Sequence, residues 1–130
     1  MLISLLTRQI IGKNYFCRLR MASIATIKSK LYVLQYDYVD DAFEKRKPHR
    51  EAHLALIGKQ VEKGNVILAG AVDNPPTGGL LIFRNLSQND IEQLAQQDPY
   101  VVNGVVKKYT IKPYMAVIGD DLLNNDLIKI

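Results

Sequence analysis

Four stretches rich in apolar, β-branched and aromatic residues are separated by polar segments along the chain, and each is typical of a β-strand. The predicted strands cover residues 31–39, 65–72, 79–86 and 105–119. The last of them contains Pro113, which cannot donate a backbone hydrogen bond and therefore indicates an edge strand or a bulge.

Two segments between these strands carry the spacing of amphipathic helices. In residues 48–64, Leu54, Ile57 and Val61 fall on one stripe, and Gly64 suits the position after the last turn. Residues 87–97 begin with the sequence Ser-Gln-Asn-Asp, which is close to a capping box. We therefore predict one helix after the first strand and a shorter one after the third.

The resulting order β-α-β-β-α-β predicts an α+β, ferredoxin-like fold with an antiparallel four-stranded sheet. The second and third strands, "VILA" and "LLIF", are apolar at every position, so both faces of the sheet should be covered. Two helices cover only one face. We expect the other to meet a second copy of the chain in a homodimer; the alternative is that the C-terminal tail folds back over it.

The first 30 residues differ in composition from the rest and are set apart from the predicted domain of residues 31–119. They are basic, contain no acidic residue and mix Leu and Ile with Ser and Thr, which is typical of a mitochondrial targeting segment. Alternatives are an unstructured extension, or translation from Met21, which would leave the protein in the cytoplasm. Residues 120–130 form a tail of uncertain structure.

Charge and composition narrow the classes of function. The net charge of +4 comes from the six bases of residues 1–30, because the remainder holds 11 bases against 13 acids. A slightly acidic body argues against a nucleic-acid partner. No apolar run reaches the roughly 18 residues that a membrane span needs. The "TGG" at residues 77–79 is too short for a nucleotide-binding loop, so no cofactor is predicted.

The only two histidines, His49 and His53, lie four residues apart on the first predicted helix. A zinc hydrolase motif would need Glu directly after the first histidine, but Arg50 stands there, so no metal site is predicted. His49 falls in the first turn among charged residues and is expected to be solvated. His53 borders the apolar stripe, where a histidine is either a structural group or an acid–base catalyst.

Asp98 bears on that choice, because it precedes a proline and so should end the second helix and turn towards the sheet. A carboxylate that reaches Nδ1 of His53 would select its tautomer and leave Nε2 available for proton transfer. The alternative is that Asp98 only accepts hydrogen bonds from nearby backbone N–H groups.

The segments "EKRKPHREAHL", "GNVILAGAVDNPPTGGLLIF", "DPYVVNGV" and "IKPYMAVIG" closely resemble the YciI-like (YCII-related) family, over about residues 31–119. The resemblance implies a dimeric α/β barrel of ferredoxin-like subunits. That family's Arg-x-x-His-Leu segment is matched by Arg50, His53 and Leu54, and its Asp-Pro-Tyr/Phe corner begins here at Asp98. A His–Asp pair is the family's proposed active site, which implies His53 and Asp98.

Most members of that family have no assigned reaction, and one branch resembles dehydrochlorinases. The leading hypothesis is therefore a small homodimeric enzyme of lyase or isomerase type that needs no cofactor. His53 would act as general acid or base on a small organic acid, Asp98 would orient it, and Arg50 would hold a substrate carboxylate or enolate. The alternative is a non-catalytic module that binds a small ligand or a partner on the same barrel.

Overall fold

A computed structural model describes residues 31–118 of the chain. The targeting prediction for residues 1–30 and the tail of residues 120–130 lie outside the described residues. The described elements are β1 (Leu31–Tyr38), α2 (Ala42–Lys45), the 3-10 helix η1 (Lys47–His49), α3 (Arg50–Glu62), β2 (Val66–Val72), β3 (Gly78–Phe83), α4 (Gln88–Gln97), α5 (Pro99–Val102) and β4 (Val106–Tyr114).

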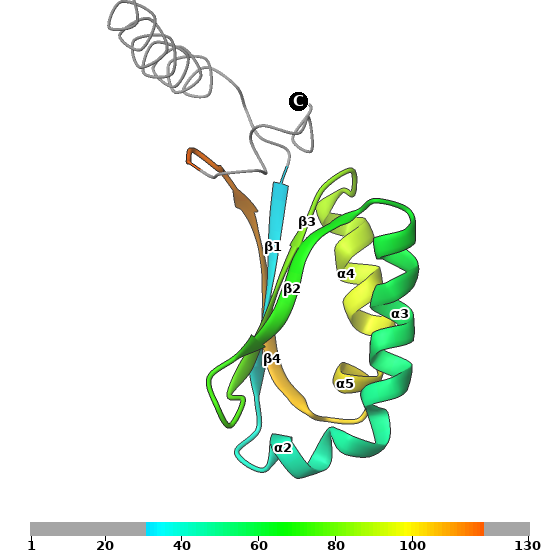
Figure 1. Cartoon of the computed structure of the whole chain (residues 1–130), viewed down its shortest axis with the longest axis vertical. Coiled ribbons are helices and arrows are strands. Elements are labelled where there is room, and N and C mark those ends of the chain that lie inside the picture. Colours follow the sequence, from blue (N-terminus) through cyan, green and yellow to red (C-terminus); the bar gives the residue numbers. More distant parts are fainter. Residues whose placement is uncertain (1–30, 119–130) are drawn as a thin grey trace, which may run out of the picture. The chain divides into compact units, whose positions relative to one another are not determined.

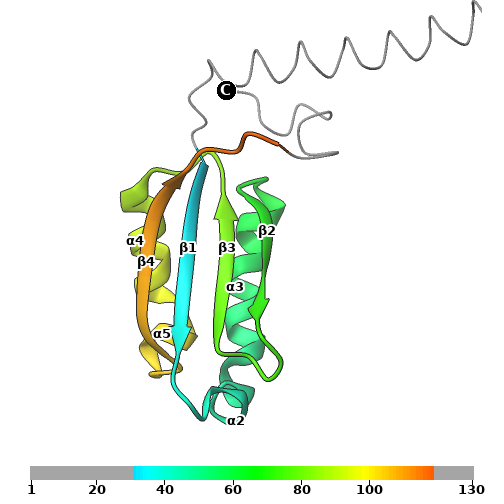
Figure 2. The same ribbon diagram turned by 90° about the vertical axis from the view of Figure 1, so that its left-hand side faces the viewer.

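The four strands form one antiparallel sheet in the order β2-β3-β1-β4, which confirms the predicted ferredoxin-like arrangement. The helices all lie on one side of this sheet, which Figure 1 shows edge-on. Figure 2, turned by 90°, looks onto the face of the sheet without helices, and the helices lie behind it. β4 is an edge strand, as Pro113 indicated, and pairs only with β1. Residues 115–118 continue without regular secondary structure.

The hydrophobic core fills the layer between the sheet and the helices. Alternate residues of β1 point into it because successive side chains of a strand face opposite sides, and Leu34, Tyr36 and Tyr38 are all buried. On the helix side, Ile91, Leu94 and Ala95 of α4 are buried, as their spacing predicted. None of the helices within residues 31–118 is long and apolar enough to cross a bilayer.

Two local sequence signals are confirmed, one at the end of α3 and one at the start of α4. Gly64 follows α3 with a φ of +75°, a left-handed conformation that glycine adopts without strain. α4 begins with a complete capping box, in which the Ser87 side chain accepts from the Asp90 N–H and the Asp90 side chain accepts from the Ser87 N–H. These signals are local because the groups that make the contacts are only three residues apart.

The predicted stripe on the first helix was wrong. Leu54 and Val61 are 50% and 54% exposed, and of that stripe only Ile57 is buried. The face of α3 that turns inward instead follows His53, Leu56, Ile57 and Gln60, all at least partly buried at helical spacing. The inward face is rotated by about one residue from the predicted stripe. His53 therefore lies on the inward face and not at the border of it.

Several boundaries also differ from the predictions. The charged segment before Pro48, for which no element was predicted, forms the short α2, and Pro48 itself lies in the 3-10 helix η1. β3 ends at Phe83 and β4 at Tyr114, earlier than the apolar composition suggested. The residues of β2 are mostly exposed. Leu68 and Val72 lie on the face of the sheet away from the helices, which nothing within the described chain covers, and Ala69 and Ala71 line a cavity on the helix side.

Candidate active site

His53 belongs to the first turns of α3, where it lies above the middle of the sheet. Its side chain is only 13% exposed, although the neighbouring Arg50 and Leu54 are exposed. The helix therefore places one ring nitrogen towards the core and leaves the rest of the imidazole near the surface. This position is suited to a group that exchanges protons with a ligand.

Asp98 lies at the corner between α4 and α5. As its place before Pro99 indicated, its backbone leaves the helical region, with φ −64° and ψ 124°. It is also the N-cap of α5, since its Oδ1 accepts the backbone N–H of Tyr100 at 2.9 Å. This short helix is absent from the sequence prediction. The cap turns the side chain inward, and Asp98 is fully buried.

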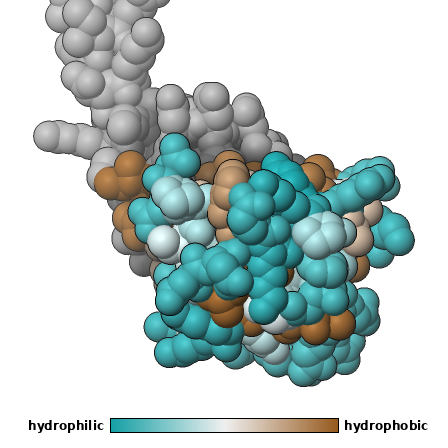
Figure 3. All heavy atoms as spheres, turned by 90° about the horizontal axis from the view of Figure 1, so that it is seen from below, coloured by the Kyte–Doolittle hydropathy of each residue, from teal (hydrophilic) through white to brown (hydrophobic). Residues whose placement is uncertain are grey.

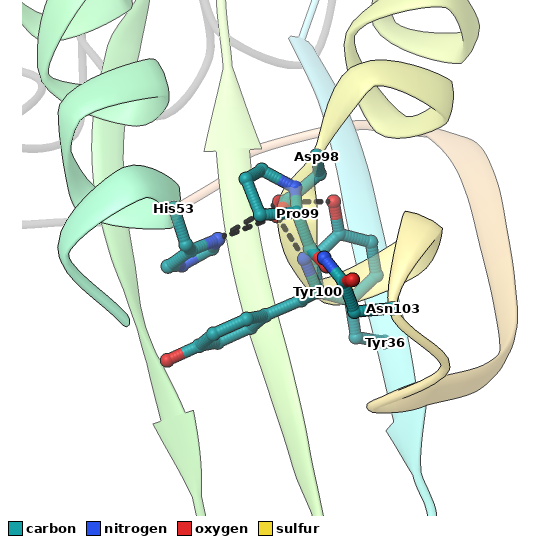
Figure 4. Close-up of polar contacts among 6 residues, drawn as sticks. All are labelled: Tyr36, His53, Asp98, Pro99, Tyr100 and Asn103. Atoms are coloured by element: carbon teal, nitrogen blue, oxygen red, sulfur yellow. Dashed lines mark hydrogen bonds and ion pairs between the residues drawn. The ribbon is translucent and has the colours of Figure 1, made fainter. Parts of the chain in front are cut away.

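The two residues meet beneath α3. Nδ1 of His53 lies 2.9 Å from both carboxylate oxygens of Asp98 (Figure 4). The Tyr36 hydroxyl, from β1, donates to Oδ2 at 2.8 Å. A buried carboxylate thus receives three donors from three elements, which satisfies it without a cation. Both sequence alternatives for Asp98 hold together: it contacts the histidine and caps the following helix.

Tyr100 fixes the orientation of the imidazole ring. Its ring lies parallel to that of His53, with the centroids 3.9 Å apart and an angle of 4° between the planes. The opposite side of this contact is held by Tyr38, whose ring meets Tyr100 edge-on at 6.1 Å. The imidazole can therefore neither tilt nor turn without disturbing the stack.

The tyrosine hydroxyls near the pair stay protonated at neutral pH. Burial first, and then the Asp98 carboxylate, raise the pKa of Tyr36 far above its usual range. Burial also raises the pKa of Tyr38 to about 12, with Tyr100 acting in the same direction and the Arg46 guanidinium opposing it. The Tyr36 hydroxyl thus keeps the hydrogen that it donates to Asp98, and the Tyr38 hydroxyl keeps one that it can donate.

A cavity of about 330 Å³ adjoins the pair, between α3 and the strands β2 and β3. Its lining combines apolar side chains with polar ones, and the polar members are Tyr36, Tyr38, Arg46, Arg50, His53 and Tyr100. No acidic residue takes part in that lining. The Nε2 atom of His53 makes no hydrogen bond to any residue of the described chain.

The two arginines give this cavity a positive character. Arg50 makes no ion pair within residues 31–118, and Arg46 contacts the Phe43 ring at 5.4 Å. The surrounding end of the molecule, built by α2, η1 and the start of α3, presents a mostly hydrophilic surface interrupted by small apolar areas (Figure 3). An anionic ligand is the natural complement of such a lining.

The site residues that the sequence named are thus His53, Asp98 and Arg50, and all three lie at or directly beneath this cavity. Sequence reasoning missed the three tyrosines and Arg46. The alternation in "LQYDYV" was a usable signal, because it puts Tyr36 and Tyr38 on one face of a strand. Within the described chain, the His49 side chain has no hydrogen-bond partner, although its backbone N–H donates to the Arg46 carbonyl, and no group of three His, Cys, Asp or Glu side chains could hold a metal.

Comparisons with known proteins agree with this architecture. Residues 30–115 match the model of the YCII-related domain. The protein YciI of Escherichia coli is 35% identical over 96 residues, which cover 67% of this chain and 98% of that protein. An uncharacterised protein of Haemophilus influenzae is 32% identical over 95 residues, which cover 66% of this chain and 97% of that one.

A solved structure shares the fold at low sequence identity. It is a 5-chloro-2-hydroxyhydroquinone dehydrochlorinase from Burkholderia phenoliruptrix, in complex with 2,5-dihydroxybenzoquinone. The two chains superpose with a TM-score of 0.57 at 18% identity, over 65% of this chain and 92% of the other.

Proposed function

The chain belongs to the YCII-related domain family, and we propose that it is a small enzyme in which His53 transfers a proton on an organic acid. One observation carries the proposal. The imidazole is held on one side by a buried carboxylate, and its free nitrogen adjoins a cavity with two arginines and no acidic side chain. Perturbed or buried polar pairs beside a pocket are typical of acid–base sites.

The tautomer follows from the nature of the partner. An ionised carboxylate only accepts hydrogen bonds, so Nδ1 carries the hydrogen in the contact with Asp98. Nε2 then keeps its lone pair and acts as a base towards a C–H or O–H group of the ligand. After it has accepted a proton, the Asp98 carboxylate stabilises the imidazolium, and His53 can return the proton as an acid.

The substrate class follows from the rest of the lining. Arg50, with Arg46 beside it, would bind a carboxylate or an enolate oxygen, since guanidinium groups bind planar anions through two parallel hydrogen bonds. Lyase and isomerase steps fit, because their main requirement is the movement of one proton and no cofactor is needed. The shared fold with a dehydrochlorinase supports an elimination, in which removal of a proton expels a leaving group from the neighbouring carbon.

Replacing His53 with Gln tests this proposal. The assays are chloride release from 5-chloro-2-hydroxyhydroquinone and NMR detection of deuterium uptake from D2O by a panel of enolisable acids. Since a positioned acid–base group contributes roughly 10²- to 10⁴-fold, the variant should lose about that factor. His49→Gln is the matched control and should keep the wild-type rate. Equal rates for His53→Gln and wild type would remove the proposed mechanism. Binding of a panel compound without any turnover would favour the non-catalytic binding module.

We further infer that two copies of the chain associate through the face of the sheet that carries no helices. The register places Val33 and Leu68 on either side of Ile82, at positions that alternate with the buried core residues. Leu68 is 62% exposed and Val72 is 43% exposed in the single chain. Contiguous apolar side chains on an open sheet face favour a homodimer.

Sedimentation velocity tests the dimer. Wild-type protein should sediment as a dimer at micromolar concentration, and Leu68→Lys should shift the distribution to monomers. Val102→Lys is the control, because Val102 is 67% exposed but lies on α5, on the helix side of the sheet. A monomeric wild type, or a Leu68→Lys variant that still dimerises like Val102→Lys, would contradict the inference.

A further inference from the structure

The Tyr100 hydroxyl is buried and lacks a hydrogen-bond partner among the described residues. The residue is only 2% exposed, and its backbone N–H and its ring already have roles at the His53–Asp98 pair. In Figure 4 the hydroxyl lies at the end of the ring that points away from Asp98. An unpaired buried hydroxyl opposes folding, because it loses its hydrogen bonds to water without replacement.

A second tyrosine stands beside it. Tyr38 packs edge-on against the Tyr100 ring, lines the same cavity and makes no hydrogen bond through its hydroxyl to any residue that the structure describes. Gly79 makes room for this hydroxyl, because a Cβ at that position would stand only 3.0 Å from it. The strand β3 is therefore shaped to admit a phenolic oxygen at this wall of the cavity.

The charges around the two hydroxyls favour an anionic oxygen. The guanidinium groups of Arg46 and Arg50 act electrostatically on Tyr38, and no acidic side chain contributes to the lining. Burial raises the pKa of Tyr38 to about 12, so its hydroxyl keeps a hydrogen to donate, and the Tyr100 hydroxyl has no partner among the described residues. A carbonyl or oxyanion of a ligand would thus meet two donors inside a positive, largely enclosed site, where such donors act most strongly.

We propose that the hydroxyls of Tyr100 and Tyr38 form an oxyanion subsite, which donates hydrogen bonds to a substrate carbonyl oxygen as that oxygen becomes an enolate. This rests on the proposed function. Nε2 of His53 takes a proton from the carbon next to the carbonyl, the C–H electron pair forms the new C=C bond, and the carbonyl oxygen receives the negative charge. The substrate is then an enolisable carbonyl compound that also carries an acidic group for Arg50.

The 4-nitrophenolate ion probes this subsite directly, because it mimics an enolate oxygen on a planar ring and its absorption band shifts on binding. Wild-type protein should bind it, and Tyr100→Phe should bind it about 10- to 100-fold more weakly, the value of one hydrogen bond to a charged group. Tyr38→Phe should show a loss of similar size. Tyr32→Phe is the matched control, since Tyr32 packs against the same core outside the cavity lining.

Two further readouts separate a role in catalysis from a role in folding. Tyr100→Phe should melt no lower than wild type, because it removes a hydroxyl that has no partner. With a substrate from the His53 screen, it should lower kcat more than it changes KM, since the oxygen is charged only during reaction. If Tyr100→Phe and Tyr38→Phe both bind 4-nitrophenolate as tightly as wild type, or if wild type does not bind it, the subsite is refuted.

The two proposals can fail separately. If His53→Gln abolishes turnover while the tyrosine variants change neither probe affinity nor kcat, only the oxyanion subsite is refuted. If the tyrosine variants weaken probe binding while His53→Gln reacts like wild type, proton transfer by His53 is refuted and the subsite stands as a binding element.

Discussion

Replacement of Asp98 by Asn keeps the shape of the side chain but changes which hydrogen bonds it can make. The carboxylate accepts from Nδ1 of His53, from the Tyr36 hydroxyl and from the Tyr100 N–H. An asparagine has one acceptor oxygen, and its NH₂ group can only donate. If the oxygen keeps the bond to the Tyr100 N–H, the NH₂ group faces Tyr36 and Nδ1. His53 can then accept from this NH₂ group at Nδ1 and carry its hydrogen on Nε2, whereas an Nδ1–H would have to share the one oxygen, also 2.9 Å away, with the Tyr100 N–H.

The size of the effect can be worked out from these three contacts. The bonds from His53 and Tyr36 to an ionised group are worth about 1.5–3 kcal/mol each, and the neutral bonds that replace them about 0.5–1.5 kcal/mol. The expected loss in free energy of unfolding over these two bonds is therefore about 2–3 kcal/mol. Since domains of this kind have about 5–15 kcal/mol in total, the variant should still fold. Its turnover should fall on the order of 10²- to 10⁴-fold, because the tautomer no longer offers a base.

Two measurements check this prediction without depending on each other. Urea denaturation gives the change in free energy of unfolding. Long-range ¹H–¹⁵N NMR correlations report which ring nitrogen of His53 carries the hydrogen, with His49 as an internal reference in the same spectrum. We expect Nδ1–H in the wild type and Nε2–H in Asp98→Asn.

One result would refute the reasoning directly. If Asp98→Asn keeps the Nδ1–H tautomer and its turnover matches the wild type, the carboxylate does not orient the histidine. A large loss of stability with unchanged turnover would leave Asp98 with only its structural role as the cap of α5.

Three further predictions concern the fold and the targeting segment of residues 1–30. Gly78→Ala should destabilise the protein by about 1–3 kcal/mol in urea denaturation, because the new Cβ would collide with the rigid backbone carbonyl of Tyr36, whereas Gly70→Ala meets open space and should change little. Ser87→Ala should cost about 1 kcal/mol through loss of the capping box, and an unchanged denaturation midpoint would contradict this. Residues 1–30 fused to a fluorescent protein should direct it to mitochondria, and a diffuse signal would count against targeting.

Much of the fold could be predicted because its signals are local. A strand can be predicted from its composition and from the alternation of apolar residues. The end of α3 can be predicted from Gly64 and the start of α4 from the Ser87–Asp90 pair, because the contacts span only a few residues. The order of the elements then restricts the topology to a small set of arrangements. The end of β4 was predicted too late because the apolar residues 115–118 continue past its last paired residue, Tyr114. The predicted end of β3 was also too late, since pairing stops at Phe83, before the polar Arg84 and Asn85.

The inward face of α3 could not be predicted correctly from hydrophobicity. In the folded chain, His53 and Gln60 are partly buried on the inward face of α3, while Leu54 and Val61 stay exposed. Which side of a helix is buried depends on the shape of its partners, and the partners of α3 include α5, which is distant in sequence. Hydrophobicity alone therefore places His53 at the border of the apolar stripe and not on the inward face.

His53 and Asp98 were named from the sequence, through the proline corner and the resemblance to a family, but their meeting is a tertiary fact. The two residues are 45 positions apart, and the contact exists because α3 and the α4–α5 corner cover the same face of one sheet. The roles of Tyr36, Tyr38 and Tyr100 were decided at the same level. A phenol becomes a buried donor or a stacking partner only when the fold removes water from around it. That burial depends on tertiary contacts and cannot be predicted from the local sequence.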